Sequence, residues 1–149
     1  MIVVGSPIIS NNVNRYNIIH RDIIGSISND TNSTLFLKEA KLKHGKWREN
    51  GQPDKQVLVD DTATFNAGKQ TGASYGVTGQ IEYSAENTAK YTLTFNNPYS
   101  GDNSASLKCE FKGETYTLNE FVRYNKTDQP MNLTVKLVSI EQFVSVTTS

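Results

Sequence analysis

The sequence predicts an all-β protein, a single-domain antiparallel β-sandwich. Several runs alternate apolar and polar residues with a period of two, which is typical of strands with one buried and one solvent-facing side. These runs are short and are separated by turn-forming residues. Asparagine, serine and threonine outnumber helix formers such as alanine and leucine. The alternation alone does not separate a sandwich from a barrel.

The N-terminal residues are the hardest part to interpret. Residues 1–17 are apolar enough to include an edge strand, and residues 18–24 fit a short helix or a strand equally, because their periodicity does not decide. Residues 25–29 predict a strand that enters a turn at 30–33. We therefore treat residues 1–25 as an N-terminal extension of uncertain structure within one domain, 1–149.

A long extended run covers residues 34–48, and its alternation slips by one residue near Glu39. Such a slip is what a β-bulge produces. Residues 49–54 have the composition of a turn, residues 56–65 predict the next strand, and residues 66–76 form a glycine-containing connection.

The clearest element is a β-hairpin with strands at residues 79–84 and 90–95. Ile81 and Tyr83 alternate with polar neighbours in the first strand, and Leu93 and Phe95 do so in the second. Pro98 cannot donate a hydrogen bond to a sheet, so the second strand is expected to end just before it. The hairpin therefore ends in loops that contain glycine and aromatic residues, and we expect binding to occur there.

The remaining strands follow the hairpin. They are expected at residues 104–111, 114–124 and 132–138, with a turn at 112–113 and a loop at 125–130. Cys109 alternates with Leu107 and Phe111, so we expect a buried thiol that serves as an apolar filler. As the single cysteine, it excludes an intramolecular disulfide framework.

Composition and motifs argue against several function classes. The chain has 15 basic and 15 acidic residues, a balance that does not indicate nucleic-acid binding. His20 and His44 lack the spacing of metal ligands, and no nucleophile elbow or phosphate loop occurs. Asp60 and Asp61 would point to opposite faces of a strand, although a turn there would relax this objection. We predict a non-enzymatic protein without catalytic residues, cofactor or metal.

No segment of the sequence reaches the length of an apolar membrane-spanning helix. Residues 1–9 are apolar but short and lack a basic leader, so they are not interpreted as a signal peptide. We expect the protein to be made in the cytoplasm and released.

Aromatic and basic residues give the candidate binding site. The only tryptophan, Trp47, lies between Lys46 and Arg48, where it either contacts a membrane or a partner, or fills the end of the core. Tyr75 and Tyr99 lie in predicted loops and are expected to be exposed. If these residues meet at one end of the sandwich, they form a patch suited to a lipid head group, a glycan or a protein partner.

Three segments resemble the aegerolysin family. They are STLFLKEAKL at residues 33–42 with HGKW at 44–47, TGAS with YGVTGQIEY at 71–83, and TFNNPYSGDN at 94–103. The subgroup they resemble most is the small component of bacterial binary insecticidal toxins. The resemblance implies a β-sandwich that binds lipid or membrane and acts with a larger partner to permeabilise target cells, here insect midgut epithelium.

One departure from the family concerns the second turn. Fungal members that recognise sphingolipid-rich membranes carry tryptophans there, whereas this chain has Phe95, Asn96, Asn97 and Tyr99. Their lipid preference therefore does not transfer to this chain.

These observations lead to one main hypothesis and two alternatives. The main hypothesis is a membrane-binding small component of a two-component pore-forming, cytolytic toxin; its partners are a membrane lipid or receptor and a larger protein, and a homo-oligomer is left open. Lys46, Trp47, Arg48, Tyr75 and Tyr99 would make the contact. The first alternative is a lectin-like, carbohydrate-binding sandwich, because loops rich in asparagine and aspartate with exposed tyrosines suit sugars. The second is an enzyme with a dispersed site, which the lack of a catalytic cluster opposes.

Overall fold

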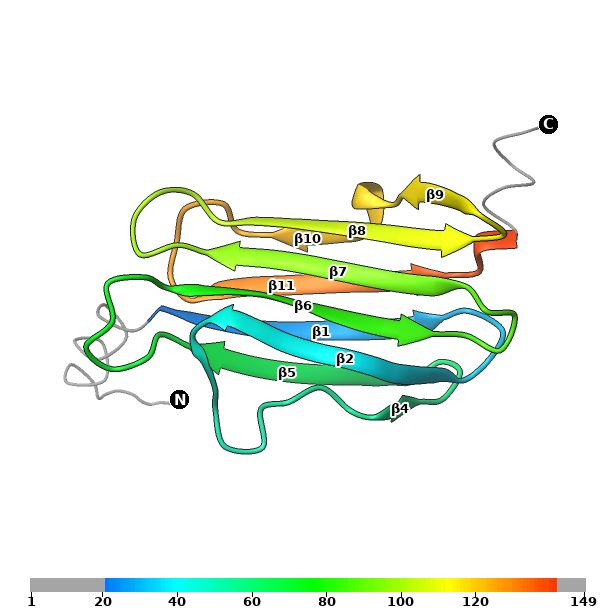
Figure 1. Ribbon diagram of the computed structural model, residues 1–149, viewed down its shortest axis with the longest axis horizontal. Coiled ribbons are helices and arrows are strands. Elements are labelled where there is room, and N and C mark those ends of the chain that lie inside the picture. Colours follow the sequence, from blue (N-terminus) through cyan, green and yellow to red (C-terminus); the bar gives the residue numbers. More distant parts are fainter. Residues whose placement is uncertain (1–20, 142–149) are drawn as a thin grey trace, which may run out of the picture.

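The computed structural model describes residues 21–141, which form two β-sheets packed face to face (Figure 1). The five-stranded sheet has the order β10-β11-β1-β5-β3, and the six-stranded sheet has the order β4-β2-β6-β7-β8-β9. The predicted sandwich is confirmed. All strand pairs are antiparallel except β1 and β11, which run parallel.

The strands of the five-stranded sheet are β1 (Asp22–Asp30), β3 (Lys46–Trp47), β5 (Thr62–Gly68), β10 (Val122–Tyr124) and β11 (Met131–Val138). Those of the six-stranded sheet are β2 (Leu35–His44), β4 (Gln56–Val57), β6 (Val77–Ser84), β7 (Lys90–Asn97), β8 (Ser104–Phe111) and β9 (Glu114–Thr117). A short 3-10 helix, η1 (Asn119–Phe121), precedes β10. No helix in this part of the chain is long and apolar enough to cross a membrane.

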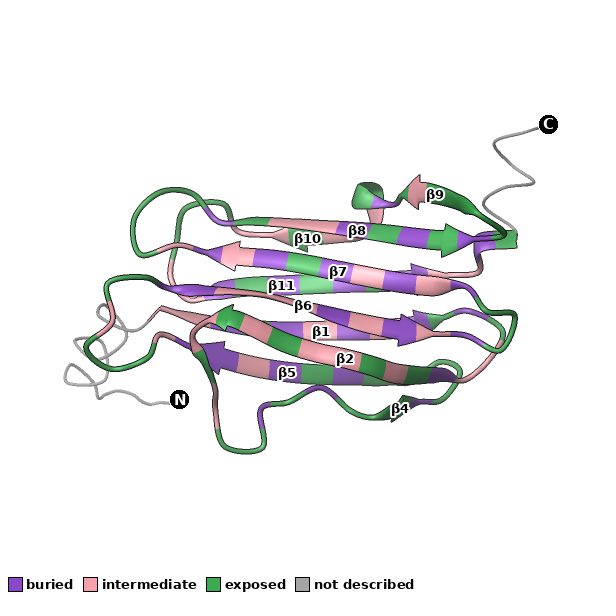
Figure 2. Ribbon diagram, viewed as in Figure 1, coloured by how far each residue is buried: buried purple, intermediate pink, exposed green. Residues whose placement is uncertain are grey.

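The core lies between the sheets and follows the alternation of the strands. Buried and exposed residues alternate along β11 and β5, as Figure 2 shows by colour. Phe65 of β5 meets Phe95 of β7 across the core, with 5.6 Å between their ring centroids. Apolar side chains removed from water in this way supply the main driving force for the fold.

Two polar side chains, Tyr91 and Cys109, are buried in the core. The Tyr91 hydroxyl donates to the Val138 carbonyl at 2.6 Å, which links β7 of one sheet to β11 of the other. Burial raises the pKa of this hydroxyl, so it stays a neutral donor. Cys109 is fully buried, as predicted, and burial raises the pKa of its thiol to about 12. Thiolate is scarce at neutral pH in such a site, so the geometry does not favour a nucleophile.

The predicted bulge in β2 is confirmed, and a second irregularity follows it. The register with β6 shifts between Leu37 and Glu39 and again between Leu42 and His44. The chain then turns at Gly45, whose φ of +103° favours glycine, and continues as β3 beside β5 in the other sheet. The predicted single run 34–48 is therefore two strands in two different sheets.

Two predicted strands were wrong because a turn interrupts each one. The run 56–65 breaks at residues 58–61, where the Asp61 amide donates to the Leu58 carbonyl and Asp60 has a φ of 68°. The apolar residues Leu58 and Val59 led to the prediction of a strand, yet both side chains are exposed in this turn. Asp60 and Asp61 are exposed there too. In residues 21–141 no group of three or more His, Cys, Asp and Glu is placed to hold a metal.

The predicted strand at residues 114–124 is also interrupted, here by the 3-10 helix η1, and the chain changes sheet there. The chain leaves β9 at Leu118, which is fully buried, passes through η1, and joins the five-stranded sheet as β10. Asn119 stabilises the crossing, because its Oδ1 accepts from the Leu107 amide at 2.8 Å. Only tertiary pairing distinguishes this crossing from a continuous strand.

Other boundaries agree with the sequence more closely. The central hairpin is confirmed and is longer than predicted, from Val77 paired with Asn97 to Ser84 paired with Lys90. The turn at 112–113 and the loop at 125–130 are confirmed. Residues 66–68 belong to β5 and not to a connection, and β1 begins at Asp22, so residues 22–25 lie in the sandwich. The interpretations of residues 1–17 and of His20 fall outside the described residues.

Candidate functional site

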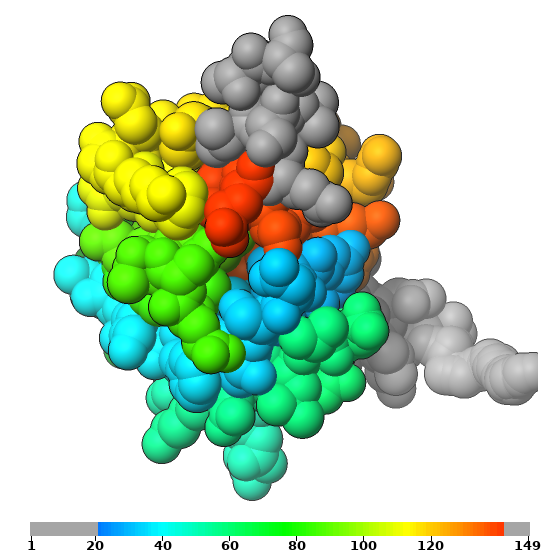
Figure 3. Space-filling view, turned by 90° about the vertical axis from the view of Figure 1, so that its right-hand side faces the viewer, coloured from blue at the N-terminus to red at the C-terminus, as the bar shows by residue number. Residues whose placement is uncertain are grey.

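Four connections meet at one end of the sandwich, on the left in Figure 1. They are residues 44–48, which run from the end of β2 through β3, and the loops 69–76 between β5 and β6, 98–103 between β7 and β8, and 125–130 between β10 and β11. We call them the loop end. Strand pairing places them together, because Gly68 lies opposite both Asp22 and Lys46, and Val77 lies opposite Asn97. Figure 3 shows the opposite end, which faces the viewer there.

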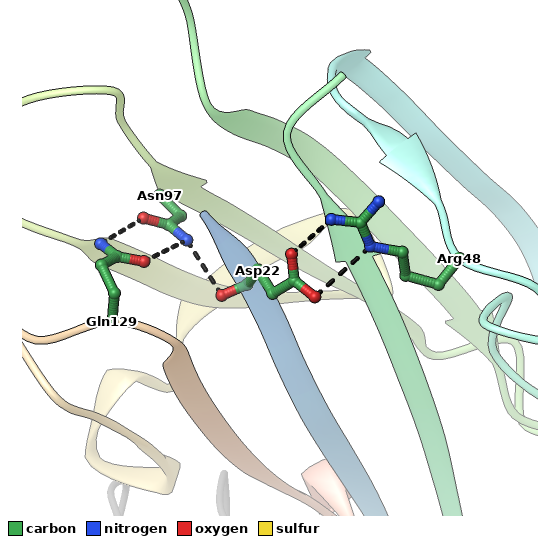
Figure 4. A network of polar contacts seen from close by, with 4 residues as sticks. All are labelled: Asp22, Arg48, Asn97 and Gln129. Atoms are coloured by element: carbon green, nitrogen blue, oxygen red, sulfur yellow. Dashed lines mark hydrogen bonds and ion pairs between the residues drawn. The ribbon is translucent and has the colours of Figure 1, made fainter. Parts of the chain in front are cut away.

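A polar network that we call the sheet clamp joins the two sheets at the loop end (Figure 4). Asn97 of β7 donates from Nδ2 to the Asp22 carbonyl of β1 at 3.0 Å. Asn97 and Gln129 exchange two further hydrogen bonds of 3.0 and 2.8 Å. Arg48 holds the Asp22 carboxylate through Nη2 at 2.6 Å and Nε at 3.4 Å. Because Asn97 is fully buried, its amide depends on these partners.

Two more asparagines fix the loops to one another. Asn103 donates its main-chain N–H to the Lys126 carbonyl at 2.7 Å and its Nδ2 to the Asn125 carbonyl at 2.8 Å. Asn125 donates from Nδ2 to the Asp128 and Pro130 carbonyls at 3.0 and 2.9 Å. The loop 98–103 therefore rests on the loop 125–130 through side-chain to main-chain bonds. This arrangement gives Asn103 a loop-holding role through its two N–H donors, whereas its buried Oδ1 has no hydrogen-bond partner within residues 21–141.

The two predicted loop tyrosines are both exposed at the loop end. Tyr75 is 53% exposed and stacks on His44 with 3.9 Å between ring centroids. Tyr99 is 51% exposed, and the Arg21 guanidinium and the Lys69 ammonium lie 5.7 and 5.6 Å from its ring centroid. Cations at this distance are attracted by the ring face. Each tyrosine thus carries a basic group beside it and still presents about half of its surface to solvent.

The other three predicted residues lie at the same end in different settings. Lys46 is exposed. Trp47 is half-buried against the core, with its ring edge toward Phe65 and 6.4 Å between centroids. Arg48 is engaged with Asp22, and its guanidinium covers Gly68 so closely that a Cβ there would lie 1.9 Å from Nη2. Of the two roles considered for Trp47, its packing fits the one in which it fills the end of the core. Arg48 is part of the sheet clamp.

Sequence reasoning missed several residues of the loop end. Lys69 lay inside a connection that was predicted, but nothing local marked it as a neighbour of Tyr99. Arg21 and Gln129 come from opposite ends of the chain, so only the parallel pairing of β1 with β11 brings them there. Asn97 and Asn103 carried a usable signal, since both belong to the turn segment at residues 94–103.

Charge is distributed unevenly although the chain is neutral overall. On the side of β2, β3 and β5, the loop end carries Arg21, Lys43, Lys46 and Lys69, and no ion pair in residues 21–141 involves them. Two exposed carboxylates at this end, Asp102 and Asp128, lie in the loops on the other side, and a third, Glu49, follows Arg48 on the basic side. Exposed carboxylates also mark the turns of the opposite end: Asp30, Asp60, Asp61 and Glu86. The result is a local basic surface next to the two tyrosines.

The fold and this end together define a small two-sheet protein that presents aromatic and basic side chains from fixed loops. The chain belongs to the aegerolysin family, whose model matches residues 19–122. A search of curated protein sequences finds no match.

Solved structures give the same architecture. The lipid-binding protein Nakanori is similar with a TM-score of 0.67 and 11% identity, covering 78% of this chain and 70% of that one. RahU, solved with Tris, has a TM-score of 0.58 and 15% identity over 80% of this chain and 95% of its own. IP-1A from Alcaligenes faecalis has a TM-score of 0.58 and 19% identity over 80% and 91%. At such identities the likeness shows the fold.

Replacing the central amide of the sheet clamp tests its structural role. Asn97→Ala should lower the free energy of unfolding by about 2 kcal/mol, because it leaves the Gln129 amide and the Asp22 carbonyl without their buried partner. Urea unfolding measures the change. The neighbouring Asn96→Ala is the matched control and should cost less than about 1 kcal/mol, since Asn96 is only half-buried. Equal losses in the two variants would contradict the clamp.

Proposed function

We propose that this aegerolysin binds membrane lipid through the loop end, as the small, non-enzymatic component of a two-component toxin. The observation that carries the proposal is the pairing of two half-exposed tyrosines with basic groups, Tyr75 with His44 and Tyr99 with Arg21 and Lys69. The loop of Tyr99 is held in place by side-chain hydrogen bonds of Asn103. Membership of the family and the likeness to a protein described as lipid-binding support it.

The chemistry of the loop end suits a membrane surface. A tyrosine ring is apolar with a polar tip, so it partitions to the boundary between head groups and acyl chains. Lys69 and Arg21 flank the Tyr99 ring and can meet lipid phosphates with their charged heads while their stems lie on apolar surface. Each basic residue near an anionic surface contributes on the order of 1 kcal/mol. A local basic surface can act in this way even on a chain of zero net charge.

Fixed loops make such contact less costly. Binding requires ordering of the groups that touch the ligand, and loops already held by Asn103 and Asn125 lose less freedom. In this proposal Tyr75, Tyr99 and Lys46 touch the membrane, Lys69 and Arg21 join them, and Trp47 and Arg48 position the end from behind.

The second part of the proposal concerns the partner. Three segments resemble the small component of bacterial binary insecticidal toxins, which motivates a larger protein that permeabilises the membrane once this chain has bound. The target would be insect midgut epithelium, reached after release of the protein from the cell that makes it.

Removing the two exposed rings should abolish most membrane binding. Tyr75→Ala/Tyr99→Ala should weaken binding to insect midgut vesicles by about tenfold or more, because loss of two interfacial rings costs on the order of 1.4 kcal/mol. Vesicle sedimentation measures the affinity.

The matched control removes exposed apolar groups from the opposite end. Leu58 and Val59 are 53% and 42% exposed in the turn between β4 and β5, so Leu58→Ala/Val59→Ala should leave vesicle binding unchanged. Unaltered binding by the tyrosine variant, with its fold intact, would remove the proposed contact site.

The division of labour can be tested on the chain alone. At concentrations that saturate vesicle sedimentation, this protein should release no trapped dye, because the proposal assigns permeabilisation to the larger partner. Calcein release from the same vesicles is the measurement. Dye release by this chain without a second protein would argue against a two-component mechanism and leave the lipid-binding part standing.

A further inference from the structure

We propose that a groove on the outer face of the six-stranded sheet binds a carbohydrate carrying an anionic group, such as a sulfated sugar. The groove lies where β2, β6, β7 and β8 run side by side near the loop end, and its volume is about 550 Å³. Sites for small molecules in proteins have volumes of this order. It lies beside the loop end and shares Lys43 and His44 with it, but neither Tyr75 nor Tyr99 lines the groove.

The two irregularities of β2 build one wall of this groove. The first shift in register places Lys41 opposite Gln80, and the second places His44 opposite Thr78, so both residues face outward beside polar residues of β6. Without the first shift, strict alternation would turn Lys41 and Lys43 to the other face; with the first shift alone, it would turn His44 there. Lys43 also lines the groove, between these two residues.

The charge of the groove is positive. Lys41, Lys43 and His44 line it, and none of its lining residues carries a carboxylate. Neither lysine takes part in an ion pair within the described part of the chain. Glu39 contacts one lining residue, because it accepts a hydrogen bond from Gln80 Nε2 at 2.5 Å. An anion is therefore favoured at the Lys43 and His44 side of the groove, away from Glu39.

The floor and the second wall offer hydrogen-bonding groups of the kind that sugars use. Thr78 donates from Oγ1 to the Asn96 Oδ1 at 2.8 Å, which orients the carboxamide and leaves its Nδ2 as the available donor. Gln80 donates an Nε2 hydrogen to Glu39, so its Oε1 remains as an acceptor. Thr94 and Ser106 add hydroxyl oxygens as acceptors, because their hydrogens are donated to the Ser106 carbonyl and the Asn119 Oδ1. A sugar hydroxyl, which both donates and accepts, can pair with either kind of group.

The test titrates the full chain with a sulfated heparin disaccharide and with its desulfated counterpart, by isothermal titration calorimetry. The sulfated probe should bind saturably and the desulfated probe at least about tenfold more weakly, as expected for loss of a charge-assisted hydrogen bond. Lys43→Gln and Asn96→Ala should each weaken binding of the sulfated probe by about tenfold. Lys136→Gln removes an exposed lysine from the other sheet and should change nothing.

Two results would overturn the groove. One is the absence of saturable binding of the sulfated probe, and the other is an equal loss in Lys136→Gln, which would mean unspecific attraction between charges. A second experiment compares vesicles that contain a sulfated galactolipid with vesicles that contain the unsulfated lipid. It tells whether the anionic sugar is a lipid head group or a free glycan. Binding that depends on Lys43 supports the groove, whether the sugar is on a lipid or free. Tyr99→Ala should keep disaccharide binding, because neither Tyr99 nor its ring neighbours Arg21 and Lys69 line the groove, so failure of this proposal and failure of the lipid-binding proposal are distinguishable.

Discussion

The hydrogen bonds of Asn97 are the constraint on which the loop end depends. Asn97 ends β7 in one sheet, yet its side chain reaches the main chain of β1 in the other sheet and the Gln129 side chain beside β11. The opposite end is closed in a related way, by the Tyr91 hydroxyl on the Val138 carbonyl. In both places a buried polar group from one sheet is satisfied by the other. A change in sheet separation would therefore break hydrogen bonds as well as apolar contacts.

This closure also fixes the base of the loop that presents Tyr99. The loops 98–103 and 125–130 diverge from the clamp and are joined again by Asn103 and Asn125. Gly76 belongs to the same arrangement, because a Cβ at this position would lie 2.0 Å from the Asn97 carbonyl oxygen. The loop that presents Tyr75 thus passes directly over the end of β7. Tyr75 and Tyr99 occupy neighbouring loops because β6 and β7 are paired there.

The sequence was informative where a local pattern matched a local structure. The hairpin of β6 and β7, the bulge near Glu39, the burial of Cys109 and the exposure of Tyr75 and Tyr99 all followed from alternation and turn residues. The errors arose where tertiary pairing decided. Leu58 and Val59 look like strand residues but form a turn, and the chain around Leu118 changes sheet inside an apparently continuous strand. Arg48 looked like a free cation, but its partner Asp22 is distant in sequence and close only through the pairing of β1 with β5.

The central claim is that the loop end is the face that meets a membrane. Hydrogen–deuterium exchange of the full chain, with and without midgut vesicles, tests it most directly because it requires no substitution. We predict slower exchange on vesicles in residues 69–76 and 98–103, and unchanged exchange in the turn at 58–61 of the opposite end. Binding that slows exchange at 58–61 and leaves both tyrosine loops unchanged would contradict the account.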